Sequence, residues 1–130
     1  MEQPPSPEQH NIPPLHETLP AELGFIETEE LRDAREFMRA AIRQDNPDEV
    51  RRLRILYKTL AEQVVEQVDD KLHYEAEIGR IVAEASLWYE AGDINNYLDD
   101  IEAAIDYARN LHLYGLVERL RSSVDKYYLD

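Results

Sequence analysis

Four arginines follow one another at spacings of three, four and four residues, which places their side chains along one face of a predicted helix. The guanidinium group is planar and can hold a carboxylate or a phosphate through two parallel hydrogen bonds. This face predicts docking onto an acidic protein surface, for which residues 93–106 of a second copy of the chain are one candidate. The structural alternative is a solvated face that pairs with acids of its own helix. The four residues are Arg32, Arg35, Arg39 and Arg43.

Three tyrosines near the C-terminus form a second candidate contact surface. Tyrosine is enriched at protein interfaces because its ring is apolar while its hydroxyl group forms hydrogen bonds. We expect these residues to contact a partner: Tyr114, Tyr127 and Tyr128. Four other aromatic residues fall on apolar stripes and are expected in the core: Tyr57, Trp88, Tyr89 and Tyr97.

One histidine lies between acids at helical spacing, as metal-binding histidines do in helical bundles. His73 follows Asp70 by three residues and precedes Glu77 by four. A dinuclear site needs a second helix of this kind, and His112 has no acid–histidine motif beside it. We therefore expect a surface histidine paired with acids, and we predict neither a metal nor another cofactor.

Several pairs of acids three residues apart resemble the Glu-x-x-Glu and Glu-x-x-Asp pairs with which all-α nucleotide pyrophosphohydrolases hold Mg²⁺. The resemblance implies a Mg²⁺-dependent hydrolase as an alternative function. Such spacings also arise by chance in a chain with 28 acids. There is no Gly-x-Ser-x-Gly motif and no glycine-rich phosphate loop, so we predict no catalytic residues and no enzyme activity. The pairs are Glu27/Glu30, Asp33/Glu36 and Glu66/Asp69.

The 130 residues carry 28 Asp and Glu against 14 Lys and Arg, a net charge of −14. Phosphate backbones and anionic membranes repel such a chain, so we expect neither direct nucleic-acid binding nor membrane association. Residues 59–130 hold sixteen acids and six bases, which leaves a second alternative, an acidic nucleic-acid mimic that inhibits a basic protein. Without cysteine or a long apolar run, neither a secretory signal nor a membrane span is expected, and we predict a cytoplasmic protein.

Residues 1–20 contain six of the seven prolines, which lack the N–H group that helices and sheets require. We expect a disordered proline-rich tail, in which Ile12, Leu15 and Leu19 stand out as apolar side chains that can dock. Residues 21–130 are expected to form a single helical domain.

From Thr28 onwards, apolar residues recur at spacings of three and four, the pattern of amphipathic helices. Asn46 and Pro47 mark a helix start, and Gly92 with Asp93 marks a stop followed by a new start. The fold class is therefore all-α, with four or five antiparallel amphipathic helices in a bundle or a short helical-hairpin array. The expected helices cover about residues 28–44, 47–68, 70–91 and 93–111, with a last one after residue 115. We place a break at residues 69–70, because an unbroken helix over residues 47–91 would be about 67 Å long.

The two predicted helices on either side of Gly92 resemble a helical hairpin of the tetratricopeptide type, over residues 81–111. Its departures from that pattern are Glu84, Tyr97 and Arg109, and no repeat of about 34 residues precedes it. The resemblance implies a protein-binding surface rather than an active site. The residues that match the apolar and small positions are Ile81, Ala85, Trp88, Ile101 and Ala104.

These features predict a non-catalytic helical protein–protein interaction module that acts as an adaptor, a regulator or an oligomer subunit. Its partner is expected to be another protein or a second copy of the chain. The Mg²⁺-dependent hydrolase and the nucleic-acid mimic remain the alternatives.

Overall fold

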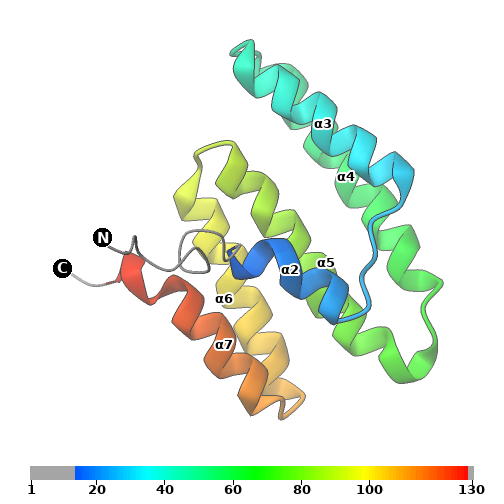
Figure 1. Ribbon diagram of the computed structural model, residues 1–130, viewed down its shortest axis with the longest axis vertical. Helices are drawn as coiled ribbons and strands as arrows, with labels where there is room; N and C mark the ends of the chain where they lie inside the picture. The colour runs from blue at the N-terminus through cyan, green and yellow to red at the C-terminus, as the bar shows by residue number, and fades with distance from the viewer. Residues whose placement is uncertain (1–13, 129–130) are drawn as a thin grey trace, which may run out of the picture.

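The computed structural model describes residues 14–128. This part of the chain is all-α, with six α-helices, a short 3₁₀ turn and no strand (Figure 1). From α3 onwards, consecutive helices fold back on one another through connections of a few residues. The bounds are α2 Leu15–Glu22, α3 Glu29–Arg43, α4 Pro47–Glu66, α5 Asp70–Glu90, α6 Ile94–Asn110, α7 Tyr114–Val124 and η1 Asp125–Tyr127.

The helix starts predicted at residues 28, 46 and 93 are confirmed by their hydrogen bonds. The side chains of Thr28, Asn46 and Asp93 each accept a hydrogen bond from the backbone N–H three residues further on, at 3.2–3.3 Å. The predicted break is also confirmed, because α4 ends at Glu66 and α5 begins at Asp70. Local capping chemistry therefore accounts for most of the helix boundaries.

The sixth helix, α2, lies within the segment predicted as a disordered tail. Leu15, Leu19 and Leu23 follow one another at spacings of four, and Leu19 is fully buried. Pro20 removes one hydrogen bond from this helix, but packing of the leucine stripe against α5 compensates for the loss. The tail prediction is thus corrected for residues 15–20. Residues 1–13, which make up the rest of the predicted tail, lie outside the described residues.

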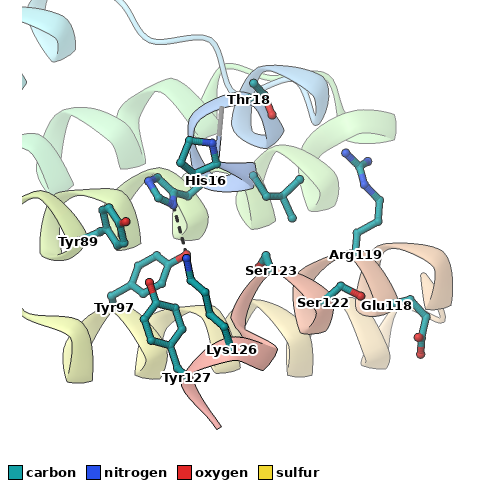
Figure 2. Close-up of a pocket in the computed structure, with 12 residues that line it drawn as sticks. His16, Thr18, Tyr89, Tyr97, Glu118, Arg119, Ser122, Ser123, Lys126 and Tyr127 are labelled. Carbon is teal, nitrogen blue, oxygen red and sulfur yellow. Dashed lines mark hydrogen bonds between the residues drawn. The ribbon is translucent and has the colours of Figure 1, made fainter. Parts of the chain in front are cut away.

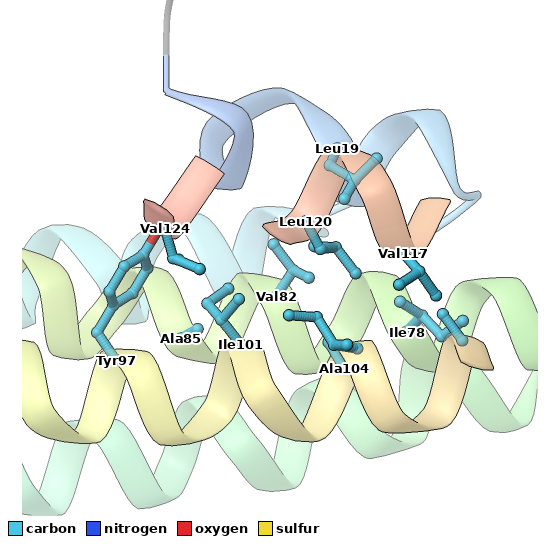
Figure 3. Packing of buried hydrophobic residues seen from close by; sticks show 12 residues of the cluster. Leu19, Ile78, Val82, Ala85, Tyr97, Ile101, Ala104, Val117, Leu120 and Val124 are labelled. Carbon is cyan, nitrogen blue, oxygen red and sulfur yellow. The ribbon is translucent and has the colours of Figure 1, made fainter. Parts of the chain in front are cut away.

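Helix α5 is the centre of the fold, because α2, α4 and α6 all pack against it (Figure 1). On one side it joins α2, α6 and α7 in an apolar cluster that we call the first core (Figure 3). The first core comprises Leu19, Ile78, Val82, Ala85, Tyr97, Ile101, Ala104, Ile105, Ala108, Val117, Leu120 and Val124.

The other side of α5 meets the hairpin formed by α3 and α4. In this second core, α5 contributes Ala83 and Leu87. The short side chain of Ala83 leaves Leu87 as the one large apolar contact from α5. The other members of the second core are Phe25, Leu31, Ala34, Met38, Ala41, Leu53, Tyr57, Ala61 and Val65.

The end of α2 crosses α5 at Gly79. A Cβ atom at Gly79 would lie 2.9 Å from the Cβ of Phe25 and 3.0 Å from the carbonyl oxygen of Pro20. Because one of these neighbours is backbone, it cannot rotate away. The absence of a side chain at this position therefore lets α2 lie directly on α5.

The described helices are amphipathic or, like α5, interrupted by charged residues. None of those in residues 14–128 combines the length with the apolar content that a bilayer crossing requires.

Candidate partner-binding channel

Helix α2 packs on α5, with α3 along one side and α7 along the other (Figure 1). We call this seat of α2, together with the clefts on its two sides, the channel. This short helix does not fill the channel. A cleft of about 830 Å³ stays open between α2 and α7, and a cleft of about 650 Å³ stays open between α2 and α3. We call them the α7 cleft and the α3 cleft, and His16 of α2 borders both.

Aromatic rings from four elements meet in the α7 cleft (Figure 2). His16 Nδ1 lies 3.2 Å from the hydroxyl oxygen of Tyr97. The Tyr97 ring packs edge-to-face against Tyr89 and Tyr127, with ring centroids 5.2 and 6.2 Å apart. This is the preferred geometry of aromatic pairs, because the positive ring edge faces the negative ring face.

Burial favours the uncharged forms of His16 and Tyr97 in this cluster. It lowers the pKa of His16 below the ordinary 6.5, although Glu17 and Glu90 act in the opposite direction. Burial also raises the pKa of Tyr97 to about 12. The cleft therefore offers neutral rings and hydrogen-bonding groups rather than a buried charge.

Cationic side chains lie at the edge of the α7 cleft. Arg119 of α7 has its Nη2 atom 3.2 Å from both carboxylate oxygens of Glu22 in α2. Lys126 places its Nζ atom 5.2 Å from the centre of the Tyr127 ring. The exposed hydroxyl of Ser122 lines the same wall. Together these groups can receive a peptide that carries both apolar and acidic side chains.

Three of the predicted arginines line the α3 cleft. Arg32 is exposed and donates a hydrogen bond to the backbone carbonyl of Glu27 at 3.2 Å. Arg35 and Arg39 lie deeper and hold acids of other segments. This wall therefore presents one exposed guanidinium group above two that are already paired.

Arg35 joins three segments of the fold through one guanidinium group. Its Nη2 atom lies 2.5 Å from Glu27, before α3, and its Nη1 atom lies 2.7 Å from Glu90 at the end of α5. The same Nη1 atom donates to the hydroxyl of Ser86 at 3.1 Å. Tyr57 of α4 donates to Glu27, and Arg39 contacts Glu90. We call this group the Arg35 cluster: Glu27, Arg35, Arg39, Tyr57, Ser86 and Glu90.

The Arg35 cluster stabilises the charged form of Arg35. Burial alone disfavours the charged guanidinium, but the neighbouring Tyr57, Glu27 and Glu90 outweigh burial and raise the pKa of Arg35. Burial is also the main cause of the raised pKa of Tyr57. Arg35 thus stays charged and Tyr57 stays neutral under all ordinary conditions.

The four predicted arginines do not form one free face. Arg32 and Arg43 are exposed, but Arg43, at the end of α3, does not line either cleft. Arg39 contacts Glu36 of its own helix, as the structural alternative expects, but Arg35 contacts Glu27 before α3. Both arginines also contact Glu90 of α5. Arg35 therefore holds the fold together, and Arg32 is the arginine of this face best placed to reach a partner.

The three C-terminal tyrosines do not form one patch either. Tyr114 begins α7 and Tyr128 follows its end, so the 11 residues of α7, about 16 Å of helix, separate them. Both are exposed, whereas Tyr127 is half-buried against the first core and lines the α7 cleft. Of the aromatic residues expected in the core, Tyr57 and Tyr97 are buried, while Trp88 and Tyr89 are half-buried.

Trp88 forms a separate contact between α4 and α5. The guanidinium carbon of Arg54 lies 4.0 Å from the centre of the Trp88 ring, in a cation–π arrangement. A cleft of about 370 Å³ opens beside this pair, between the α3–α4 turn and the α5–α6 turn. It lies away from α2.

The acids proposed for a Mg²⁺ site do not converge. In residues 14–128, no group of three or more histidine, aspartate or glutamate side chains is arranged to hold a metal ion. Glu27, from the first of the pairs, instead binds Arg35 and Tyr57. The hydrolase alternative gains no support from this arrangement.

The sequence analysis did not select His16, Ser122 or Lys126 as site residues. These residues meet only because α2 folds onto α5 and α7, and no spacing in the sequence connects residue 16 with residue 122. One signal was available, the spacing of four between Leu15, Leu19 and Leu23. The prolines around it obscured this helix.

Known proteins give no guide to the function of this channel. The chain matches no protein-family model, no curated protein and no solved structure.

Proposed function

We propose that this protein is a non-catalytic helical interaction module, an adaptor, a regulator or an oligomer subunit, that binds another protein in the channel. The observation that carries this proposal is the seating of α2, which lies along the channel and leaves an open cleft on each side. The channel thus already holds a peptide segment and has room for more. The tetratricopeptide-type relationship and the cytoplasmic location remain predictions beside it.

The chemistry of the two clefts supports a peptide ligand. The α7 cleft is lined by tyrosine rings, and tyrosine is common in protein interfaces. The two clefts together hold five basic and five acidic side chains, whereas the whole chain has a net charge of −14. The channel is therefore less repulsive to an acidic partner than the rest of the surface.

A photo-crosslinking amino acid tests this proposal in cells that express the chain. Introduced at Glu36 or Ser122, on the two walls of the channel, it is expected to yield a crosslinked partner protein. The matched controls are Glu62 and Glu66, exposed positions on α4 that line neither cleft. Equal crosslinking from α4, or no crosslinking from either wall, contradicts the proposal.

The crosslinked partner is then purified, and its affinity is measured by calorimetry. Arg32→Glu places an acid on the wall of the α3 cleft and is expected to weaken binding by about tenfold. Arg109→Glu makes the same charge change on α6 and is expected to leave the affinity almost unchanged. A partner that does not distinguish these variants binds elsewhere on the protein.

A further inference from the structure

Helix α2 is weak on its own and depends on the channel for its structure. It has eight residues, no side-chain hydrogen bond at its start, and Pro20 inside it. Isolated helices shorter than about 12 residues are marginal in water. Its order therefore comes from the seat on α5, where Leu19 is fully buried and His16 nearly so.

The chain after α2 is anchored independently of it. Gly24 adopts a φ of +91° and ends α2, with the N–H groups of Gly24 and Phe25 bonded to carbonyls of Ala21 and Pro20 at 3.0 and 2.8 Å. Phe25 is buried in the second core, and Glu27 belongs to the Arg35 cluster. A rotation at Gly24 that breaks these two hydrogen bonds releases α2, while the Phe25 side chain and Glu27 keep their contacts with the second core and the Arg35 cluster.

The seat selects a helix of defined chemistry. The buried side of α2 presents Leu15, Leu19 and Leu23 at spacings of four. Its exposed side carries two acids and no base, and one of the acids, Glu22, pairs with Arg119 of the wall. The walls add Lys126 and Arg32 at the two clefts. An amphipathic helix with this leucine spacing therefore complements the channel in shape, and Arg119 pairs with an acid at the position of Glu22.

We propose that α2 is an internal occupant of the partner site and that the partner displaces it with an amphipathic helix of its own. The displacing helix carries leucines four residues apart and an acid three residues after the central leucine, as α2 does. This inference rests on the proposed function and specifies the ligand of the same channel. The free channel exists only while α2 is released. The partner's apparent affinity is therefore its affinity for the free channel multiplied by the fraction of molecules in which α2 is released.

The probe is a synthetic peptide of residues 14–24, capped at both ends and titrated into the isotope-labelled full-length protein. Nuclear magnetic resonance shifts of Ser122 and Lys126 report its binding in the channel. Leu19→Ala removes the main apolar contact of α2 and is expected to tighten peptide binding by about tenfold or more. Glu22→Lys breaks only the exposed pair with Arg119 and is expected to tighten binding by about twofold. Glu62→Lys, an equal charge change on the exposed side of α4, is the matched control.

A covalent lock tests the displacement itself. The chain contains no cysteine, so Glu22→Cys combined with Arg119→Cys provides a unique pair that a short bis-maleimide can join. The locked protein is expected to bind the peptide at least about tenfold more weakly than the same variant with both thiols capped separately. Peptide shifts in the channel that are equal with and without the lock would overturn displacement, while leaving the channel as a binding surface.

Two other results overturn the inference. The first is no channel shift at millimolar peptide in Leu19→Ala, provided that circular dichroism shows this variant to be folded. The second is a light-scattering mass without peptide that is doubled for the unaltered protein and single once α2 is locked, because the occupant is then the α2 helix of a second copy. Failure of the proposed function is judged separately, by crosslinking from Glu36 and Ser122.

Discussion

Helix α5 is held in two different ways on its two sides. Towards α2, α6 and α7 it packs through a continuous apolar cluster that includes Ile78, Val82 and Ala85. Towards the α3–α4 hairpin it offers Ala83 and Leu87, and the Arg35 cluster and the Arg54–Trp88 pair add further contacts. Apolar contact tolerates small movements, whereas an ionic network requires every partner to be present. The two sides should therefore respond differently to substitution.

The largest effect is expected from the ionic side. Arg35→Met leaves the carboxylates of Glu27 and Glu90 partly buried without their common partner and should cost about 3 kcal/mol of unfolding free energy, because a broken buried pair leaves uncompensated charge. Urea unfolding followed by circular dichroism measures it. Arg109→Met, which breaks an exposed pair with Asp106, should cost less than about 1 kcal/mol. Equal costs would mean that apolar packing alone holds the hairpin.

The apolar side is tested by two glycines. In Gly79→Ala the new methyl group meets Phe25 and the backbone of Pro20, so we expect a net loss of about 1–2 kcal/mol after the gain in helix propensity. In Gly115→Ala the methyl group meets nothing within 4 Å, so stability should rise by up to about 1 kcal/mol. Thermal unfolding of the pair measures both. A stabilised Gly79→Ala variant would show that α2 does not sit tightly on α5.

Arg54 and Trp88 provide a smaller test of the hairpin attachment. Arg54→Ala removes the cation above the Trp88 ring and should cost about 0.5–1 kcal/mol. Because Trp88 is the only tryptophan, its fluorescence should shift to longer wavelength as water reaches the ring. Arg52→Ala, on the exposed side of α4 and outside the cleft beside Trp88, is the control and should leave the emission unchanged. An unchanged emission maximum in Arg54→Ala would mean that the Arg54–Trp88 contact does not help to hold the hairpin on α5.

The smallest effect concerns His16, the titratable group that borders the otherwise apolar side. Burial lowers its folded-state pKa, so below about pH 6.5 the unfolded chain binds a proton that folded His16 does not. Protons then favour unfolding, and stability falls as the pH drops through this window. His16 is faced by Tyr89 and Tyr97, and by the charges of Glu17, Glu90, Arg35 and Lys126. Urea unfolding at pH 7.5 and 5.5 should show that the unaltered protein loses more unfolding free energy at the lower pH than His16→Gln does. An equal loss in both proteins would mean that other groups cause the pH dependence.

Much of the fold was predictable because it depends on neighbours in the chain. Thr28, Asn46 and Asp93 cap helices within three residues of themselves, and Gly92 ends one with a φ of +82°. The turn before α7 has no glycine to mark it in the sequence, because His112 takes the left-handed conformation there, with a φ of +63°. Helix α2 was missed because its six residues nearest the N-terminus look like the proline-rich segment before them.

The candidate site was predictable only in part. Spacing correctly placed Arg32, Arg35 and Arg39 on one side of α3, but it did not show that Glu90, more than fifty residues away, binds two of them. Similarly, Tyr127 was expected at a contact surface, but no spacing revealed its neighbour Tyr97. Side-chain partners across helices depend on which helices pack together, and that information is not local.

The sequence by itself determined the all-α class, the caps and turns, and the amphipathic faces, because these follow from backbone chemistry and periodicity over a few residues. Only the tertiary structure decided that α2 enters a channel on α5, that Arg35 is a structural residue, and that two clefts remain open beside α2. The physical reason is that apolar stripes require burial but do not specify a partner. The close approach at Gly79 places α2 on α5, and the ion pairs of Glu90 with Arg35 and Arg39 place α3 beside α5.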